Sequence, residues 1–156
     1  MKNDSVKQGR FAIISLVAIS FISLVVVGYF VYANNAFAKN SNSDRSLQLV
    51  NDIRTQEGIS PLSWDDDLEQ AAQDKVNDII SKRYFQHISP TGEKAWDLVL
   101  QNGYSYTVAG ENLAIDYNSV DQAVSAWVDS SSHYTNMISD KYKDYGFAQG
   151  EGDVEG

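Results

Sequence analysis

The chain has 156 residues, no cysteine and a formal net charge of −9 at pH 7. This length allows one domain at most once a targeting segment is set aside, and 43% hydrophobic residues are enough to build one compact core. The lack of cysteine excludes a thiol nucleophile and cysteine-ligated zinc. The acidic balance argues against binding to nucleic acid, whose phosphates it would repel.

The first distinctive element is the apolar run from Phe11 to Ala33, which is 23 residues long and carries no charge. As a helix it could cross a hydrocarbon core of about 30 Å. Lys2, Lys7 and Arg10 precede it, which predicts a cytoplasmic N-terminus and an extracellular remainder.

Two interpretations of this segment stay open. The sequence Ala36–Lys39 offers an Ala-x-Ala site for cleavage after Ala38, as in a secreted protein. The run is longer than the core of a typical signal peptide, which favours an uncleaved membrane anchor. Both predict a membrane anchor or signal over residues 1–38, a polar linker over 39–44 and an extracellular domain over 45–156.

The domain begins with signals for two helices. Asp44 is a candidate cap for a helix over residues 45–57, which Gly58 can end. After the loop ISPLSW, a helix is predicted over 66–82, because Leu68, Ala71, Ala72, Val76, Ile79 and Ile80 recur at helical spacing.

Shorter elements follow. A helix is predicted over residues 95–102 and another from about Ser119, with extended chain over 104–108 and 144–149. The ending GEGDVEG is acidic and glycine-rich, so we expect it to be frayed. Together these patterns predict an α+β domain.

Three side chains stand out as candidates for chemistry. His87 and His133 are the two histidines of the chain, each in a loop-like stretch beyond a predicted helix. Glu111 lies within the mostly apolar run TVAGENLAIDY. Their spacing matches no local metal motif, so the histidines could be structural. Glu111 could likewise accept backbone hydrogen bonds in a tight turn after Gly110.

Five segments in order resemble the CAP superfamily, which includes cysteine-rich secretory, antigen-5-like and pathogenesis-related proteins, and in particular its bacterial SCP-like branch. The five segments are VNDIRTQEGISPLSWDDDLEQAAQDKVNDI with Asn51 and Arg54, YFQHISPTG, GYSYTVAGENLA, AVSAWVDSSSHYTNMI and YKDYGFA.

The resemblance implies an α-β-α sandwich with a cleft that holds two histidines and acidic groups. It places His87 and His133 as ligands of a divalent metal such as zinc. It also places Glu111 in the cleft, where a carboxylate could orient an imidazole.

Two departures from the family pattern change this expectation. Ser130 stands where many members have a second glutamate, so a metal held by His87, His133, Ser130 and water would be bound weakly. The family also has one or two further strands after the YGFA strand. We therefore expect truncated C-terminal strands and an exposed sheet edge.

The favoured function is an extracellular binding module on the cell surface, anchored in the membrane or secreted. Its His/Glu cleft, formed by His87, Glu111, Ser130 and His133, would bind a small ligand, a lipid or an envelope component, and we expect no enzymatic activity. The alternative is a metal-dependent hydrolase with Glu111 as general base. A structural or partner-binding role in the envelope is a third possibility.

Overall fold

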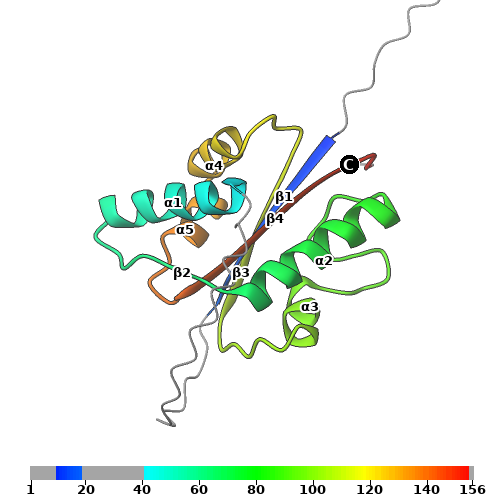
Figure 1. The fold of residues 1–156 in the computed structure, drawn as a ribbon, viewed down its shortest axis with the longest axis horizontal. Coiled ribbons are helices and arrows are strands. Elements are labelled where there is room, and N and C mark those ends of the chain that lie inside the picture. Colours follow the sequence, from blue (N-terminus) through cyan, green and yellow to red (C-terminus); the bar gives the residue numbers. More distant parts are fainter. Residues whose placement is uncertain (1–9, 19–40, 155–156) are drawn as a thin grey trace, which may run out of the picture.

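The computed structural model describes residues 10–18 and 41–154. A four-stranded mixed sheet in the order β2-β4-β1-β3 forms the centre. Helices α1, α4 and α5 cover one face and α2 and α3 the other (Figure 1). This arrangement is the α-β-α sandwich that the sequence predicted.

The elements of the described residues, in chain order, are β1 (Arg10–Ala18), α1 (Ser41–Gln56), β2 (Ser63–Trp64), α2 (Asp66–Lys82), α3 (Ala95–Gln101), β3 (Ala109–Ile115), α4 (Val120–Asp129), α5 (Ser131–Met137) and β4 (Asp144–Gly152). Strand β4 is parallel to β2 and antiparallel to β1, which is antiparallel to β3.

Local capping explains the helices that were predicted best. Asp65 caps α2 by accepting from the amide of Leu68 at 3.0 Å, and Arg83 ends it in the left-handed conformation. Ser119 caps α4 by accepting from the amide of Gln122. α3 ends one residue early, at Gln101. α1 begins at Ser41, so residues 41–44 of the predicted linker are helical.

The prediction of a helix from Phe11 was wrong for its first residues, because residues 11–18 belong to strand β1. β1 lies between β3 and β4, and both faces of the sheet are covered there. Ile14, Leu16 and Ala18 face the α2 side, and Val17 faces the α1 side. Residues 19–33 of the predicted span lie outside the described residues. Of the helices described, none is long and apolar enough to span a bilayer.

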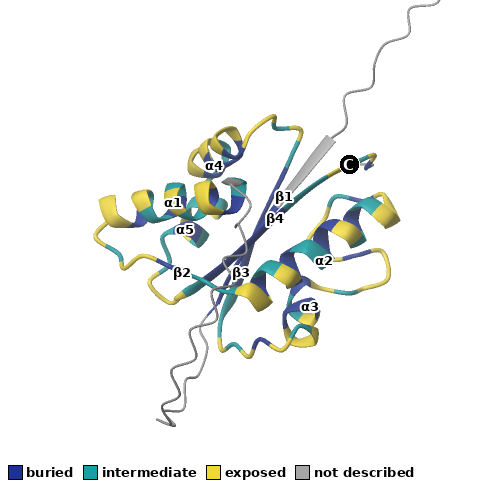
Figure 2. Cartoon of the chain, viewed as in Figure 1, coloured by how far each residue is buried: buried dark blue, intermediate teal, exposed yellow. Residues whose placement is uncertain are grey.

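The core has two layers, one on each side of the sheet (Figure 2). One packs β1, β3 and β4 against α2 and α3, and the other packs them against α1, α4 and α5. Strand residues alternate between the layers: Leu113 belongs to the first and Ala114 to the second.

One expectation about the C-terminal strand was wrong, because the glycine-rich ending continues as strand up to Gly152. The expected sheet edge is present among the described residues: β2 pairs with β4 only at Asp144 and Tyr145, and the rest of β4 pairs with β1 alone. Gly146 explains part of the packing, because a Cβ there would clash with the backbone of α2 at Leu68.

Asn51 and Arg54, the pair in the first family segment, connect α1 to other segments on the same side of the sheet. Asn51 exchanges two hydrogen bonds with the backbone of Leu62, at 3.0 and 2.7 Å. Arg54 is fully buried and donates to the carbonyls of Ser60, Met137, Ser139 and Tyr142. The arginine therefore ties α1 to the end of α5.

Candidate functional site

Glu111 lies in the middle of strand β3, not in a tight turn after Gly110. The strand begins at Ala109, and residues 104–108, which were predicted to be extended, belong to no strand. Glu111 is buried, and it shares the α2 side of the sheet with Ala109 and Leu113. A carboxylate in this position needs a polar partner.

The partner of Glu111 is His87. Oε2 of Glu111 lies 2.6 Å from Nδ1 of the imidazole, and the two side chains are 3% and 60% exposed. The hydrogen bond that the imidazole donates to Glu111, together with the charge of that carboxylate, raises the pKa of His87 against the opposing effect of burial. Oε1 of Glu111 is buried and has no hydrogen-bond partner among the residues described.

Gly110 and Asn112 flank this glutamate and contact residues on the opposite side of the sheet. A Cβ at Gly110 would lie 2.6 Å from the hydroxyl oxygen of Tyr142, so a larger residue there would require the Tyr142 side chain to move. Nδ2 of Asn112 donates to the carbonyl of His133 at 3.1 Å. Adjacent strand residues point to opposite faces. Glu111 therefore holds His87 from one face of β3, and Asn112 holds the backbone of His133 from the other.

His133 lies on helix α5, not in the loop that its sequence surroundings suggested. Ser130 is the residue between α4 and α5, and its hydroxyl lies 3.3 Å from that of Ser132. Burial, followed by the charge of His87, lowers the pKa of His133. No hydrogen bond between described residues joins His133 to His87 or Glu111.

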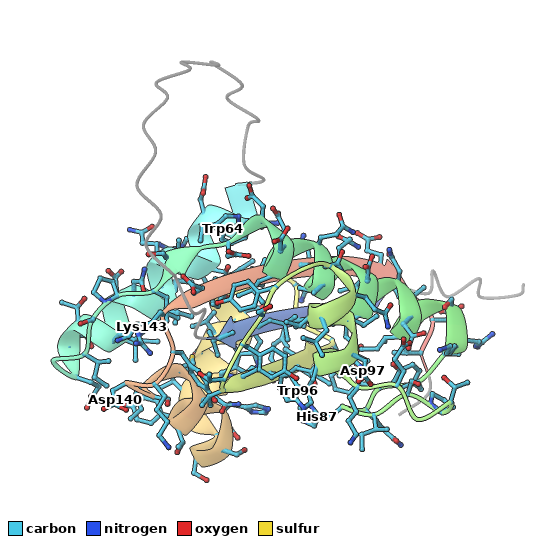
Figure 3. All side chains as sticks on the ribbon, turned by 90° about the horizontal axis from the view of Figure 1, so that it is seen from below. Trp64, His87, Trp96, Asp97, Asp140 and Lys143 are labelled. Carbon is cyan, nitrogen blue, oxygen red and sulfur yellow. The ribbon has the colours of Figure 1, made fainter. Side chains whose placement is uncertain are left out.

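Two neighbouring cavities follow β3 along its length. The larger, of about 430 Å³, is lined by His87, Glu111, Ala109, Gly110, Ile88, Lys94, Ala95, Trp96 and Asn136. The smaller, of about 260 Å³, is lined by His133, Ser130, Leu113, Ala114, Ile115, Phe85, Tyr117, Ala126 and Trp127. The four predicted site residues therefore divide between two cavities: His87 and Glu111 line the larger, and Ser130 and His133 line the smaller. Figure 3 shows His87 and Trp96 on the side of the molecule opposite Trp64.

The side chains that could donate to a metal ion here are few. Within residues 10–18 and 41–154 there is no cluster of three or more histidine, cysteine, aspartate or glutamate side chains. His87 nevertheless has the carboxylate-to-imidazole hydrogen bond that typically orients a metal-binding histidine. Two imidazoles, with water in the other positions, would hold a divalent ion loosely.

Two side chains that the sequence interpretation missed support the site. Asn136 donates from Nδ2 to the carbonyl of Glu111 at 3.1 Å and to Oδ1 of Asn112 at 3.0 Å. Lys75 is buried on α2 and donates to the carbonyl of His87. Lys75 could have been noticed, because it is a charge within the apolar stripe of its helix. Asn136 gave no comparable signal.

A family model matches most of the chain. Residues 47–153 match CAP, the cysteine-rich secretory protein family. The chain therefore belongs to the CAP family, as the five sequence segments predicted.

Relatives of known sequence and structure agree with this assignment. The chain is 34% identical over 100 residues to the Bacillus subtilis (strain 168) protein called Uncharacterized protein YkwD. This match covers 64% of the chain and 39% of that protein. The chain is also 27% identical over 108 residues to Uncharacterized membrane protein YlbC of the same strain. This second match covers 69% of the chain and 31% of that protein. The chain thus spans about a third to two fifths of these relatives.

Two solved structures share the fold. One is an extracellular protein containing a SCP domain from Bacillus anthracis str. Ames, with a TM-score of 0.67, 23% identity and coverage of 83% of this chain and 45% of that one. The other is an outer surface protein from Borrelia burgdorferi, with a TM-score of 0.60, 18% identity and coverage of 72% of this chain and 92% of that one.

Proposed function

We propose that this CAP domain acts outside the cell, membrane-attached or secreted, as a binding module for a small envelope-derived ligand. The ligand would occupy the cavity beside His87. The observation that carries the proposal is the His87–Glu111 pair, in which a buried carboxylate fixes a mostly exposed imidazole at the wall of a cavity of about 430 Å³. Pairs of this kind, with a perturbed pKa in a cleft, are typical of functional sites.

The lining of this cavity suits a ligand with both polar and apolar parts. Trp96 and Ile88 offer apolar surface, while His87, Lys94 and Asn136 offer hydrogen-bonding groups. A fragment of the cell wall, with amide, hydroxyl and methyl groups, has this mixture of chemistry. A divalent ion bound weakly by His87 and His133 could add a further contact for the ligand.

The hydrolase alternative has less support. A general base must reach a water molecule, but Oε2 of Glu111 already bonds to His87 and Oε1 is shielded from solvent. This geometry favours Glu111 as the residue that orients His87. Zinc-loaded protein that cleaved soluble peptides or wall fragments above a metal-free control, and lost this activity in Glu111→Gln, would restore the hydrolase interpretation.

Calorimetric titration of the full chain with soluble wall fragments tests the binding proposal. We expect measurable binding that weakens at least about tenfold in His87→Ala, because His87 lies at the cavity and a lost hydrogen bond to a charged or polar group costs about this much. Lys143→Ala is a suitable control, since Lys143 is exposed and lies well away from His87 in Figure 3. Equal binding by the wild type and His87→Ala would show that the ligand binds elsewhere, and no binding by either would contradict this ligand class.

A further inference from the structure

Lys75 is a charged residue at a position on its helix where the neighbouring buried side chains are apolar. It lies on the face of α2 formed by Leu68, Ala72, Val76 and Ile79, and it is only 1% exposed. Burial lowers the pKa of its ammonium group, although the charges of Glu111 and Asp78 act against this effect. An apolar side chain of similar length would avoid the desolvation penalty, so packing alone does not explain this lysine.

The ammonium group of Lys75 connects α2 to the loop that carries His87. Nζ donates to the backbone carbonyl of His87 at 3.1 Å and to the hydroxyl of Tyr84 at 2.9 Å. It also lies 5.0 Å from the centre of the Tyr84 ring. Tyr84 in turn donates to Oδ2 of Asp78 on α2. The loop is therefore attached to α2 at Tyr84 and at His87.

His87 is therefore held from inside the protein at two atoms. Glu111 on β3 holds ring Nδ1, and Lys75 on α2 holds the backbone carbonyl. The two residues are buried and oppositely charged, whereas the side chain of His87 is 60% exposed. The backbone of this loop is also held by the β-bridge between Ile88 and Lys94, with the bond from Ser89 N to Glu93 O. Among the side chains described, Lys75 is the one whose hydrogen bond to the carbonyl of His87 connects this loop to α2.

We propose that Lys75 is a positioning residue, which fixes the backbone at His87 so that the Glu111-bound imidazole stays at the wall of the larger cavity. The use of this imidazole in binding rests on the proposed function. The fixed orientation of the imidazole does not depend on the proposed function, and it can be measured without any ligand. If the wild-type protein has an ordered His87 but does not bind the ligand, the proposed function is contradicted and the positioning role of Lys75 is not.

The test is NMR relaxation of the His87 amide and its ring Cε1–H in the full chain, with His133 as the internal reference. In the wild type we expect an order parameter near the rigid level of about 0.85, and in Lys75→Met a fall below about 0.6 at His87 alone. A general loss of stability would affect both histidines. Lys143→Met makes the same change of charge away from His87 and should leave both unchanged.

Tyr84→Phe is the second variant, and it preserves the shape of the side chain if Lys75→Met fails to fold. It removes one of the two hydrogen-bond partners of the ammonium group, so we expect a smaller loss of order, again at His87 and not at His133. An unchanged His87 in a folded Lys75→Met, or in Tyr84→Phe where the first variant does not fold, would overturn the proposal.

Discussion

Glu111 and His87 are 24 residues apart in the sequence, and their side chains meet at 2.6 Å. The carboxylate is buried and the imidazole is mostly exposed, so the pair joins the core of the domain to its larger cavity. The next residue, Asn112, makes the corresponding contact to the backbone of His133 on the other face of the strand. The Gly-Glu-Asn segment thus holds both histidines.

Replacing Glu111 with glutamine should lower the pKa of His87, because the hydrogen bond and charge of Glu111 raise it. A raised pKa in the folded state means that the pair stabilises the domain fully below the ordinary pKa of histidine, and that this stabilisation disappears as pH rises through the folded-state value. Since His87 is well exposed, we expect at most about 1 kcal/mol.

The ring-proton signals of the two histidines, followed against pH, check this prediction. Free energies of unfolding at about pH 5 and about pH 9, on either side of the titration, supply the second measurement: the difference between wild type and Glu111→Gln should be larger at the lower pH. A His87 titration that is the same in both proteins would mean that the carboxylate does not bond to the imidazole in solution.

Asn112→Ala should destabilise the domain by about 1–3 kcal/mol, because it leaves the carbonyl of His133 and Nδ2 of Asn136 each without one partner. Chemical denaturation measures the change, and Asn118→Ala at an exposed position is the control. The signals of His133 should shift more than those of His87. The opposite order would show that Asn112 does not anchor α5.

Arg54→Met should reduce stability by about 3 kcal/mol or more, because it leaves several buried carbonyls unsatisfied at once. Arg45→Met is the matched control, since Arg45 is an exposed partner of Asp121 and should contribute little. Thermal and urea unfolding both report the difference. Similar losses of stability in the two variants would show that Arg54 does not tie α1 to the end of α5.

Leu16→Ala should cost about 2–5 kcal/mol of stability, because Leu16 is buried in the centre of the sheet between β3 and β4. Leu100→Ala, at a side chain that is 56% exposed, should change little. Urea unfolding of the full chain compares the two. No effect at Leu16 would mean that the domain folds without β1 and that residues 11–18 are available to a membrane helix.

Local signals predicted the helices well and the central strand poorly. The bounds of α2 followed from the apolar stripe that begins at Leu68, and the structure adds the cap at Asp65. β1 is covered on both faces, and the sequence of such a strand is a continuous apolar run. A membrane-spanning helix has the same sequence pattern. Sequence alone therefore could not separate the two. Helix α5 was missed because it is short and buries only Met137.

The site could be predicted only in part, because its contacts join distant segments. The spacing of His87, Glu111 and His133 matched no local motif, so the resemblance to the family was needed to bring them together. Lys75 was overlooked because helical periodicity was judged from its apolar neighbours alone.

The central claim to test is the proposal that His87 and His133, which line neighbouring cavities along β3, share one weakly bound divalent ion. Titration of the full chain with zinc, followed by the ring-proton signals of His87 and His133, tests it most directly. We predict that both signals shift together and weakly, and that the response fades as pH falls and the imidazoles are protonated. Independent responses, or a response of only one histidine, would contradict a shared site.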